Sequence, residues 1–90
     1  SSNQLFRVFP NPNSGMLTLE FDANQLCEYE MTMTDMIGNE IFFIQKRIDR
    51  IGRQVLNFNL DDYRLKTGLY LLMFKLGSQR SVVKLEYQQN

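Results

Sequence analysis

The sequence predicts an all-β domain in which two antiparallel sheets pack face to face. Apolar and polar residues alternate with a period of two along most of the chain, which is the pattern of half-buried strands. Clusters rich in Pro, Gly and Asn interrupt this alternation at intervals close to the roughly 8–12 residues that are typical of a β-sandwich. No helical pattern is long enough to connect parallel strands, so antiparallel sheets are expected.

The composition is that of one small domain. The chain has 90 residues, and 43% of them are hydrophobic, which is enough for a single core without disulfides or metal. The formal net charge is zero, because ten basic and ten acidic residues are spread along the chain. Since no basic block is present, we expect no binding to nucleic acid or to an anionic membrane surface. No apolar stretch approaches the roughly 20 residues of a membrane-spanning helix, so no membrane span is predicted.

The first two strands are separated by a cluster of turn residues. Residues 5–9 form a short extended run, which ends at the sequence PNPNSG of residues 10–15. Proline lacks the backbone N–H that a strand ladder needs, and Asn and Gly favour turns, so no strand continues through this cluster. Residues 16–22 then alternate and form the second predicted strand. The face expected to be buried carries Leu17, Leu19 and Phe21.

The third and fourth strands form a predicted hairpin. Residues 28–36 alternate, and residues 40–46 return after the short connection at residues 37–39, a spacing typical of a hairpin. Cys27 precedes the third strand and is expected to be a small packing residue, because its neighbour Glu28 would not activate a thiol. Three methionines of this region are interpreted as core residues: Met31, Met33 and Met36.

The fifth and sixth strands flank a break in the alternation. Residues 53–59 alternate as a strand, whereas residues 60–66 do not. The adjacent aspartates Asp61 and Asp62 suit the beginning of one short helical turn at this corner. Residues 69–75 are apolar on both faces, which predicts a strand in the centre of a sheet.

The last strand is predicted at residues 80–87, after a turn at residues 76–79. Its inward face carries Val83, Leu85 and Tyr87, and its outward face carries Arg80, Lys84 and Glu86. About seven short strands with these turn spacings predict a single immunoglobulin-like antiparallel β-sandwich over residues 1–90.

The residue inventory argues against catalysis and against a metal site. The chain has no histidine and a single cysteine, which excludes Ser-His-Asp and Cys-His catalysis, His-ligated zinc and an internal disulfide. The pair Asp61 and Asp62 offers too few oxygen ligands for calcium and is interpreted as corner and cap residues. The five glycines are scattered singly, so no phosphate-binding loop is present. We therefore predict a non-enzymatic domain with no catalytic, cofactor-binding or metal-binding residues.

Four short fragments carry a recognisable pattern. They are VFPNP at residues 8–12 followed by Gly15, MTDMIGNE at 33–40, LNFNL at 56–60 followed by TGLYLL at 67–72, and VVKL at 82–85. In this order and spacing they resemble the type A C-terminal sorting domain of the type IX (Por) secretion system of Bacteroidota. The resemblance covers about residues 5–87.

The resemblance implies a function in protein export and a set of partners. Such a domain directs a cargo protein, fused on its N-terminal side, from the periplasm across the outer membrane to the cell surface or the medium. The implied partners are the type IX translocon, outer-membrane shuttle components and a surface cysteine-peptidase sortase that usually removes the domain. No cofactor is implied. The chain begins Ser1-Ser2 without a methionine, so we expect it to be a piece of a longer protein.

The resemblance also selects two groups of site residues. The family-motif residues, expected to be mostly structural, are Pro10, Asn11, Pro12, Gly15, Asp35, Gly38, Gly68 and Tyr70. The candidates for recognition by the translocon are Arg80, Val82, Val83, Lys84, Leu85 and Glu86. Glycines 15 and 38 suit turn positions with positive φ, and Tyr70, if it points inward, needs a partner for its hydroxyl group.

The residue pattern by itself leaves a second function open. An immunoglobulin-like carbohydrate-binding or adhesion module of a secreted protein would show the same alternation and the same absence of catalytic residues. The identity of the cargo and the oligomeric state are not encoded in any of these patterns.

Overall fold

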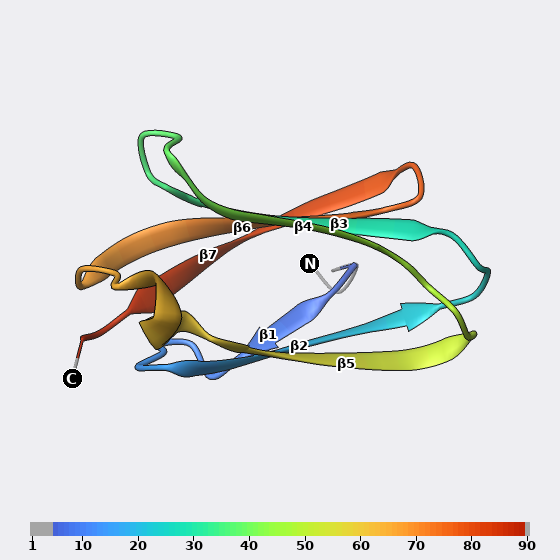
Figure 1. The fold of residues 1–90 in the computed structure, drawn as a ribbon, viewed down its shortest axis with the longest axis horizontal. Coiled ribbons are helices and arrows are strands. Elements are labelled where there is room, and N and C mark those ends of the chain that lie inside the picture. The colour runs from blue at the N-terminus through green and yellow to red at the C-terminus, as the bar shows by residue number, and fades with distance from the viewer. Residues whose placement is uncertain (1–4, 90) are drawn as a thin grey trace.

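The computed structural model describes residues 5–89 and contains seven strands and one short 3-10 helix (Figure 1). The strands are β1 (Arg7–Phe9), β2 (Met16–Ala23), β3 (Glu28–Asp35), β4 (Glu40–Arg47), β5 (Gly52–Asn59), β6 (Gly68–Leu76) and β7 (Gln79–Tyr87). The helix η1 (Leu60–Tyr63) follows β5 directly, where the sequence predicts one helical turn. All seven strands lie where the sequence predicts them, with bounds that differ by one or two residues.

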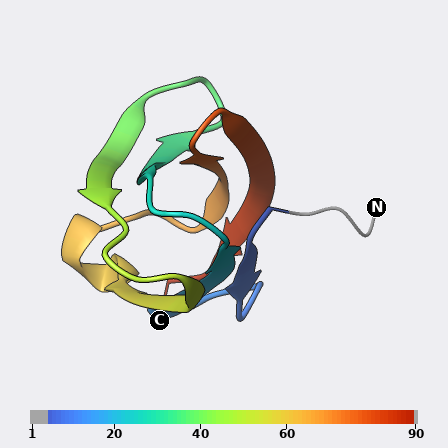
Figure 2. The same ribbon diagram turned by 90° about the vertical axis from the view of Figure 1, so that its right-hand side faces the viewer.

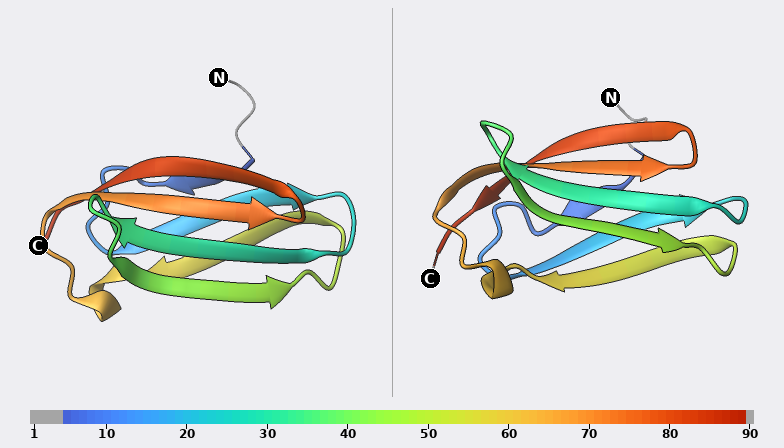
Figure 3. Two further views of the ribbon diagram at one scale, coloured as in Figure 1. Left: turned by 90° about the horizontal axis from the view of Figure 1, so that it is seen from above. Right: turned by 45° about the horizontal axis from the view of Figure 1, so that its top comes forward.

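Two antiparallel sheets pack face to face. One sheet has three strands in the order β1-β2-β5, and the other has four in the order β4-β3-β6-β7. Figure 2 shows the sandwich from one end, and Figure 3 shows the four-stranded sheet from above. The predicted all-β sandwich is confirmed, and the architecture is consistent with an immunoglobulin-like fold. The central position predicted for residues 69–75 is also confirmed, because β6 lies between β3 and β7.

The core between the sheets is centred on Phe74. The ring centroid of Phe74 lies 5.1 Å from that of Phe6, 4.7 Å from that of Phe21 and 5.9 Å from that of Tyr29. These rings come from both sheets and from the segment before β1, so they join the two layers. Burial of one such side chain stabilises a fold by roughly 1.5–3 kcal/mol. The core therefore does not depend on a disulfide, and Cys27 is a free, half-buried residue packed against it.

The methionine prediction is correct for two residues and wrong for the third. Met31 and Met33 are fully buried on the inner face of β3. Met36 is 48% exposed, because β3 ends at Asp35 and the chain turns away from the core there. Met36 also stands at an even position, whereas Met31 and Met33 stand at odd positions, so alternation by itself does not place Met36 on the inner face.

Within residues 5–89, no helix has the length and apolar character needed to cross a membrane.

Candidate functional site

The candidate recognition surface is the final hairpin, which β6 and β7 form. The two strands pair in continuous register from Gly68 opposite Tyr87 to Leu76 opposite Gln79. Their two-residue connection contains Gly77, whose φ is +61°, a value that favours glycine. The hairpin is rigidly placed, because β6 also pairs with β3 along its length.

The two faces of β7 divide the six predicted recognition residues. Four of them point to solvent: Arg80, Val82, Lys84 and Glu86. Val83 and Leu85 point inward, and Leu85 is fully buried in the core. Leu85 is not accessible to a partner of the folded domain, so its assignment as a recognition residue stays a prediction that the accessible positions carry better. A buried leucine on a strand contributes to the core, and its loss would act through unfolding.

The segment 10–15, which we call the clasp, holds the C-terminal half of β7. The Asn11 side chain donates from Nδ2 to the carbonyl oxygen of Lys84 (2.9 Å) and accepts at Oδ1 from the N–H of Glu86 (3.0 Å). The Asn13 backbone donates to the carbonyl of Glu86 (2.8 Å) and accepts from the N–H of Gln88 (2.7 Å). The Asn11 side chain thus makes the two hydrogen bonds to β7 that the backbone of a neighbouring strand would make. This gives the predicted motif position a structural explanation.

Asn13 organises the clasp itself, although it is not among the predicted site residues. It is 1% exposed, and its Oδ1 accepts from the N–H of Gly15 at 2.7 Å. Its Nδ2 donates to the carbonyls of Pro10 (3.2 Å) and Met16 (2.7 Å). Buried polar side chains are costly unless hydrogen-bonded, and here both polar atoms have partners. The signal in the sequence was an Asn in a cluster of turn residues, which is common and does not predict burial.

The prolines of the clasp end β1, as predicted. β1 stops at Phe9, and Pro10 and Pro12 are exposed. The peptide bonds before both prolines are cis.

Gly15 allows the Asp61 side chain to approach the backbone closely, and it does not have a positive φ. The predicted reason for a glycine at this position is therefore wrong. Its φ lies outside the positive range, in contrast to that of Gly38, which is +97° as predicted. A Cβ atom at position 15 would lie 3.2 Å from Oδ2 of Asp61. The carbonyl of Gly15 also accepts from the N–H of Leu60 at 2.8 Å, so the clasp contacts η1.

Asp61 connects this corner to the last strand. Its Oδ1 accepts a hydrogen bond from the Tyr87 hydroxyl at 2.7 Å. This bond raises the pKa of Tyr87, and desolvation by burial raises it further. Asp61 is also bound through its N–H, which donates to the side chain of the N-cap Asn59 at 3.1 Å. The predicted corner role of this aspartate is therefore confirmed, whereas its predicted cap role is wrong, because the N-cap of η1 is Asn59.

Asp35 and Gly38 form the turn between β3 and β4. Oδ1 of Asp35 accepts from the N–H groups of Ile37 (3.1 Å) and Asn39 (2.8 Å), and Oδ2 accepts from the Asn39 side chain (2.8 Å). The hydrogen bond from the Asn39 side chain, together with backbone donors, lowers the pKa of Asp35. The carboxylate is thus fully used in the turn, and these motif residues are structural.

Gly68 and Tyr70 begin the final hairpin. Gly68 is the first residue of β6 and directly follows a bend at Thr67. The Tyr70 ring is buried, and its hydroxyl donates to the carbonyl of Lys66 at 2.6 Å. This is the arrangement of the tyrosine corner in immunoglobulin-like sandwiches, where a hydroxyl group fixes the backbone a few residues upstream. The expected partner for the Tyr70 hydroxyl is therefore present.

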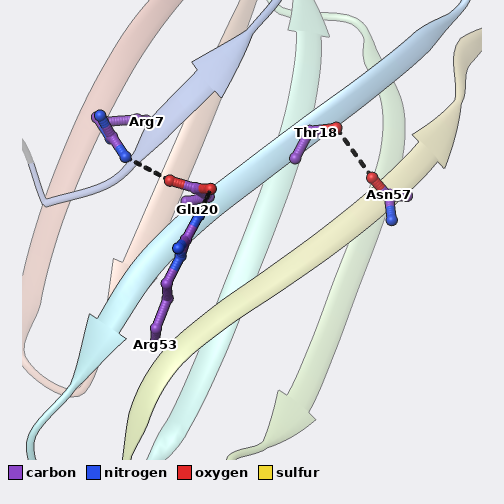
Figure 4. Close-up of polar contacts among 5 residues, drawn as sticks. All are labelled: Arg7, Thr18, Glu20, Arg53 and Asn57. Atoms are coloured by element: carbon purple, nitrogen blue, oxygen red, sulfur yellow. Dashed lines mark hydrogen bonds and ion pairs between the residues drawn. The ribbon is translucent and has the colours of Figure 1, made fainter.

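A charged cluster on the three-stranded sheet was not predicted. Glu20 is buried on the outer face of β2 and forms ion pairs with Arg7 of β1 and Arg53 of β5 (Figure 4). The hydrogen bond from Arg53 is the main cause of a lowered pKa of Glu20, and Arg7 adds to it. Alongside, Thr18 Oγ1 donates to Asn57 Oδ1 at 2.9 Å. These residues join all three strands, but local sequence patterns do not specify which strands pair.

The polar residues described above stabilise the fold. Every carboxylate and hydroxyl group with a shifted pKa among those above serves a turn, a corner or an ion pair. In the described part of the chain, no group of three or more metal-ligating side chains converges. The outward side chains of the N-terminal half of β7, Arg80 and Val82, take part in none of these contacts.

Comparison with known proteins identifies the family. Residues 7–87 match the family described as the secretion system C-terminal sorting domain. No curated protein sequence matches the chain. The matched range runs from the first residue of β1 to the last residue of β7, and so contains both the clasp and the final hairpin. It resolves the two functions left open by the residue pattern in favour of the sorting domain. The chain belongs to the C-terminal sorting domains of the Por (type IX) secretion system, which are non-catalytic and direct the secretion of the proteins that carry them.

Proposed function

We propose that this chain is the terminal domain of a longer exported protein and that the outward face of its final hairpin is the part of the export signal that the outer-membrane machinery reads. The observation that carries the proposal is the division of β7. Its inward residues are committed to the core and its C-terminal half is bound by the clasp, whereas Arg80, Val82 and the Lys84 side chain face solvent. A surface used in recognition must be accessible without unfolding.

The proposal assigns roles to the remaining parts of the domain. The clasp, the Tyr70 corner and the Asp35 turn fix the hairpin in one orientation. The type IX translocon and its outer-membrane shuttle components bind the hairpin after the cargo reaches the periplasm. A surface sortase then removes the domain, which leaves the cargo at the cell surface or in the medium. Family membership and the rigid, exposed hairpin support this sequence of events.

The test is an export assay in a host that carries this secretion system. Residues 1–90 are fused behind a periplasm-targeted fluorescent protein, and fluorescence is measured in periplasm and medium. We expect the fusion to leave the periplasm. Retention of the wild-type fusion, in a host that exports its own cargo, would overturn the proposal.

Point variants separate recognition from folding. Charge reversal at Arg80 and Lys84 should reduce export, while the melting temperature of the domain stays nearly constant, because exposed substitutions usually change stability by about 0.5 kcal/mol or less. The matched control reverses Lys46 and Arg47, two exposed cations on β4 at the other edge of the same sheet. The control should export normally. Equal loss in both variants would show that net charge, and not this surface, controls export.

A further inference from the structure

The free edge of β7 is divided into a covered part and an open part. Within residues 5–89, β7 pairs with β6 on one side only. On the other side, the clasp binds the carbonyl of Lys84, both backbone groups of Glu86 and the N–H of Gln88. In an antiparallel ladder, alternate residues direct both backbone groups to the same side. Because Lys84 and Glu86 face the free edge, Val82 and Arg80 also face it.

The open part has a definite length and composition. It comprises the N–H and C=O groups of Arg80 and Val82 and the N–H of Lys84. No hydrogen bond joins these groups to another described element, since the described backbone contacts of the edge begin at the Lys84 carbonyl. Unpaired backbone groups on an exposed strand are a template for an added strand. The clasp ends the template at Lys84, so only a short segment can be added.

The rows of side chains across the sheet indicate what that segment carries. The outer face holds an apolar row in which Phe43, Thr32, Met73 and Val82 are successive register partners. Phe43 and Val82 are 48% and 46% exposed, and Met73 is 41% exposed. Directly opposed side chains interact across neighbouring strands, so a strand added beside β7 would place an apolar residue next to Val82.

The rows on either side of this apolar row end in cations. One row ends with Lys75 opposite Arg80, and the other ends with Leu71 opposite Lys84. Like charges directly opposite each other destabilise a sheet unless a third charge compensates them. Within residues 5–89 the structure forms ion pairs only at Glu20. Glu30 is the register partner of Lys75 and compensates its charge, whereas Arg80 and Lys84 have no acid opposite them in β6.

We infer that the open edge of β7 binds an extended partner segment as a fifth strand, and that this segment carries an acidic, an apolar and an acidic residue at alternate positions. The acidic residues lie opposite Arg80 and Lys84, and the apolar residue lies opposite Val82. The pattern is the same in both directions, so it holds for a parallel or an antiparallel addition. The inference rests on the proposed function, since the partner segment belongs to the export machinery.

The first experiment tests the chemistry without export. The probe is a short blocked peptide in which Glu, Val and Glu alternate with Thr, and the control peptide has Lys in place of each Glu. Titration of the isotopically labelled chain should shift the amide resonances of Val82 and Lys84. The Lys peptide should bind at least about tenfold more weakly, and salt should weaken the Glu peptide. Shifts confined to β4 or β5, or no shift at millimolar peptide, would overturn the inference.

The second experiment separates strand addition from side-chain contact. Val82→Pro removes an edge N–H that faces solvent, a position where a strand tolerates proline, whereas Val82→Thr keeps the N–H and changes the side chain. Val82→Pro should weaken the Glu peptide by about fivefold, the effect of one hydrogen bond, and should reduce export of the reporter. Val82→Thr should reduce the peptide affinity and the export of the reporter less than Val82→Pro does. Both variants should keep nearly the melting temperature of the unaltered chain.

The outcomes distinguish a failure of the proposed sorting function from a failure of strand addition at β7. If the wild-type fusion is not exported, the proposed function fails whatever the peptide does. If the wild-type fusion is exported and Val82→Pro is exported equally well, the sorting role stands and strand addition is wrong. If Val82→Pro unfolds the chain, the pair of peptides with the unaltered chain still decides whether the edge selects acidic strands.

Discussion

The two long sides of the sandwich are closed by different chemistry. On the side of β1 and β7, the clasp joins the sheets through hydrogen bonds from Asn11 and Asn13. On the side of β4 and β5, aromatic rings join them: the centroid of Phe42 lies 5.8 Å from that of Phe58 and 5.0 Å from that of Tyr63 of η1. Figure 2 shows β1 beside β7 and β4 beside β5 at opposite sides of the sandwich.

This difference explains which parts of the fold are visible as motifs. Ring packing tolerates many apolar residues of similar size, so the aromatic side leaves little trace beyond alternation. Hydrogen bonds to fixed backbone groups need one residue type at each position, so the clasp appears in the sequence as PNPNSG. The motif is distinctive because its contacts are directional, and the larger share of stability is expected on the side without a motif.

The largest expected effect is on the aromatic side. Phe42→Ala should lower the free energy of unfolding by about 3–5 kcal/mol, because it removes a buried ring that contacts two others. Phe43→Ala is the matched control, since the neighbouring ring is 48% exposed. Urea denaturation of both variants measures the difference. Similar losses in the two variants would show that the β4–β5 side is not closed by these rings.

The next largest effect is expected at the buried residue of the clasp. Asn13→Ala should cost about 2–3 kcal/mol, because the N–H of Gly15 and the carbonyls of Pro10 and Met16 lose their partner in a buried site. Asn24→Ala, at an exposed position, should change stability by about 0.5 kcal/mol or less. A loss for Asn13→Ala as small as that of the control would place the organisation of the clasp elsewhere.

A smaller loss is expected at Asn11. Asn11→Ala should cost about 1 kcal/mol, because its two hydrogen bonds are exposed and water replaces them. It should also lengthen the open edge of β7, so hydrogen exchange at the Glu86 amide should accelerate more than exchange at Leu85. An unchanged rate of hydrogen exchange at the Glu86 amide would show that the Asn11 side chain does not protect this group.

The smallest effects concern pH. The lowered pKa values of Glu20 and Asp35 mean that their contribution to stability is present above their unfolded pKa values, near 4, and is lost as pH falls through the lowered values. The raised pKa of Tyr87 affects stability at alkaline pH. The stabilisation by the Tyr87 hydroxyl is present below about pH 10 and is lost as pH rises through the raised pKa. Melting temperatures measured against pH should show both declines.

Single substitutions assign these declines to residues. Glu20→Gln should flatten the acid limb of the pH profile, and Tyr87→Phe should flatten the alkaline limb. Tyr29, whose pKa is raised by burial, retains part of the alkaline limb in the second variant. An acid limb that is unchanged in Glu20→Gln would show that the Arg7 and Arg53 pairs do not contribute to stability in solution.

The local patterns of the sequence were sufficient for the strands but not for their neighbours. Alternation located most of the strands, because inner and outer faces repeat every two residues, and apolar residues on both faces showed the central position of β6. It could not show that Glu20 lies between Arg7 and Arg53, since that requires knowing that β2 pairs with both β1 and β5. For the same reason the contact of Phe42 with Tyr63 was not predicted.

The candidate site was predicted in part. The outward face of β7 followed from alternation, whereas the orientation of Tyr70 was left open, because its strand is apolar on both faces. Asn13 was missed and Gly15 was assigned the wrong reason, because in both cases the cause is a contact with a residue far along the chain or a buried hydrogen bond. The open length of the β7 edge depends on where the clasp binds, which no pattern within β7 encodes.

The clasp also has a mechanical consequence. Asn13 and Tyr87 form a parallel bridge, with the upstream chain leaving the clasp at one end and the C-terminal residues leaving β7 at the other. Tension between a cargo and the C-terminal end of the domain therefore loads the four hydrogen bonds from Asn11 and Asn13 to β7 in shear, all at once. Single-molecule pulling from the two termini should then meet a higher rupture force than pulling between residues 67 and 88, which lie at the open end of the hairpin, because that geometry peels β7 from β6 one pair at a time.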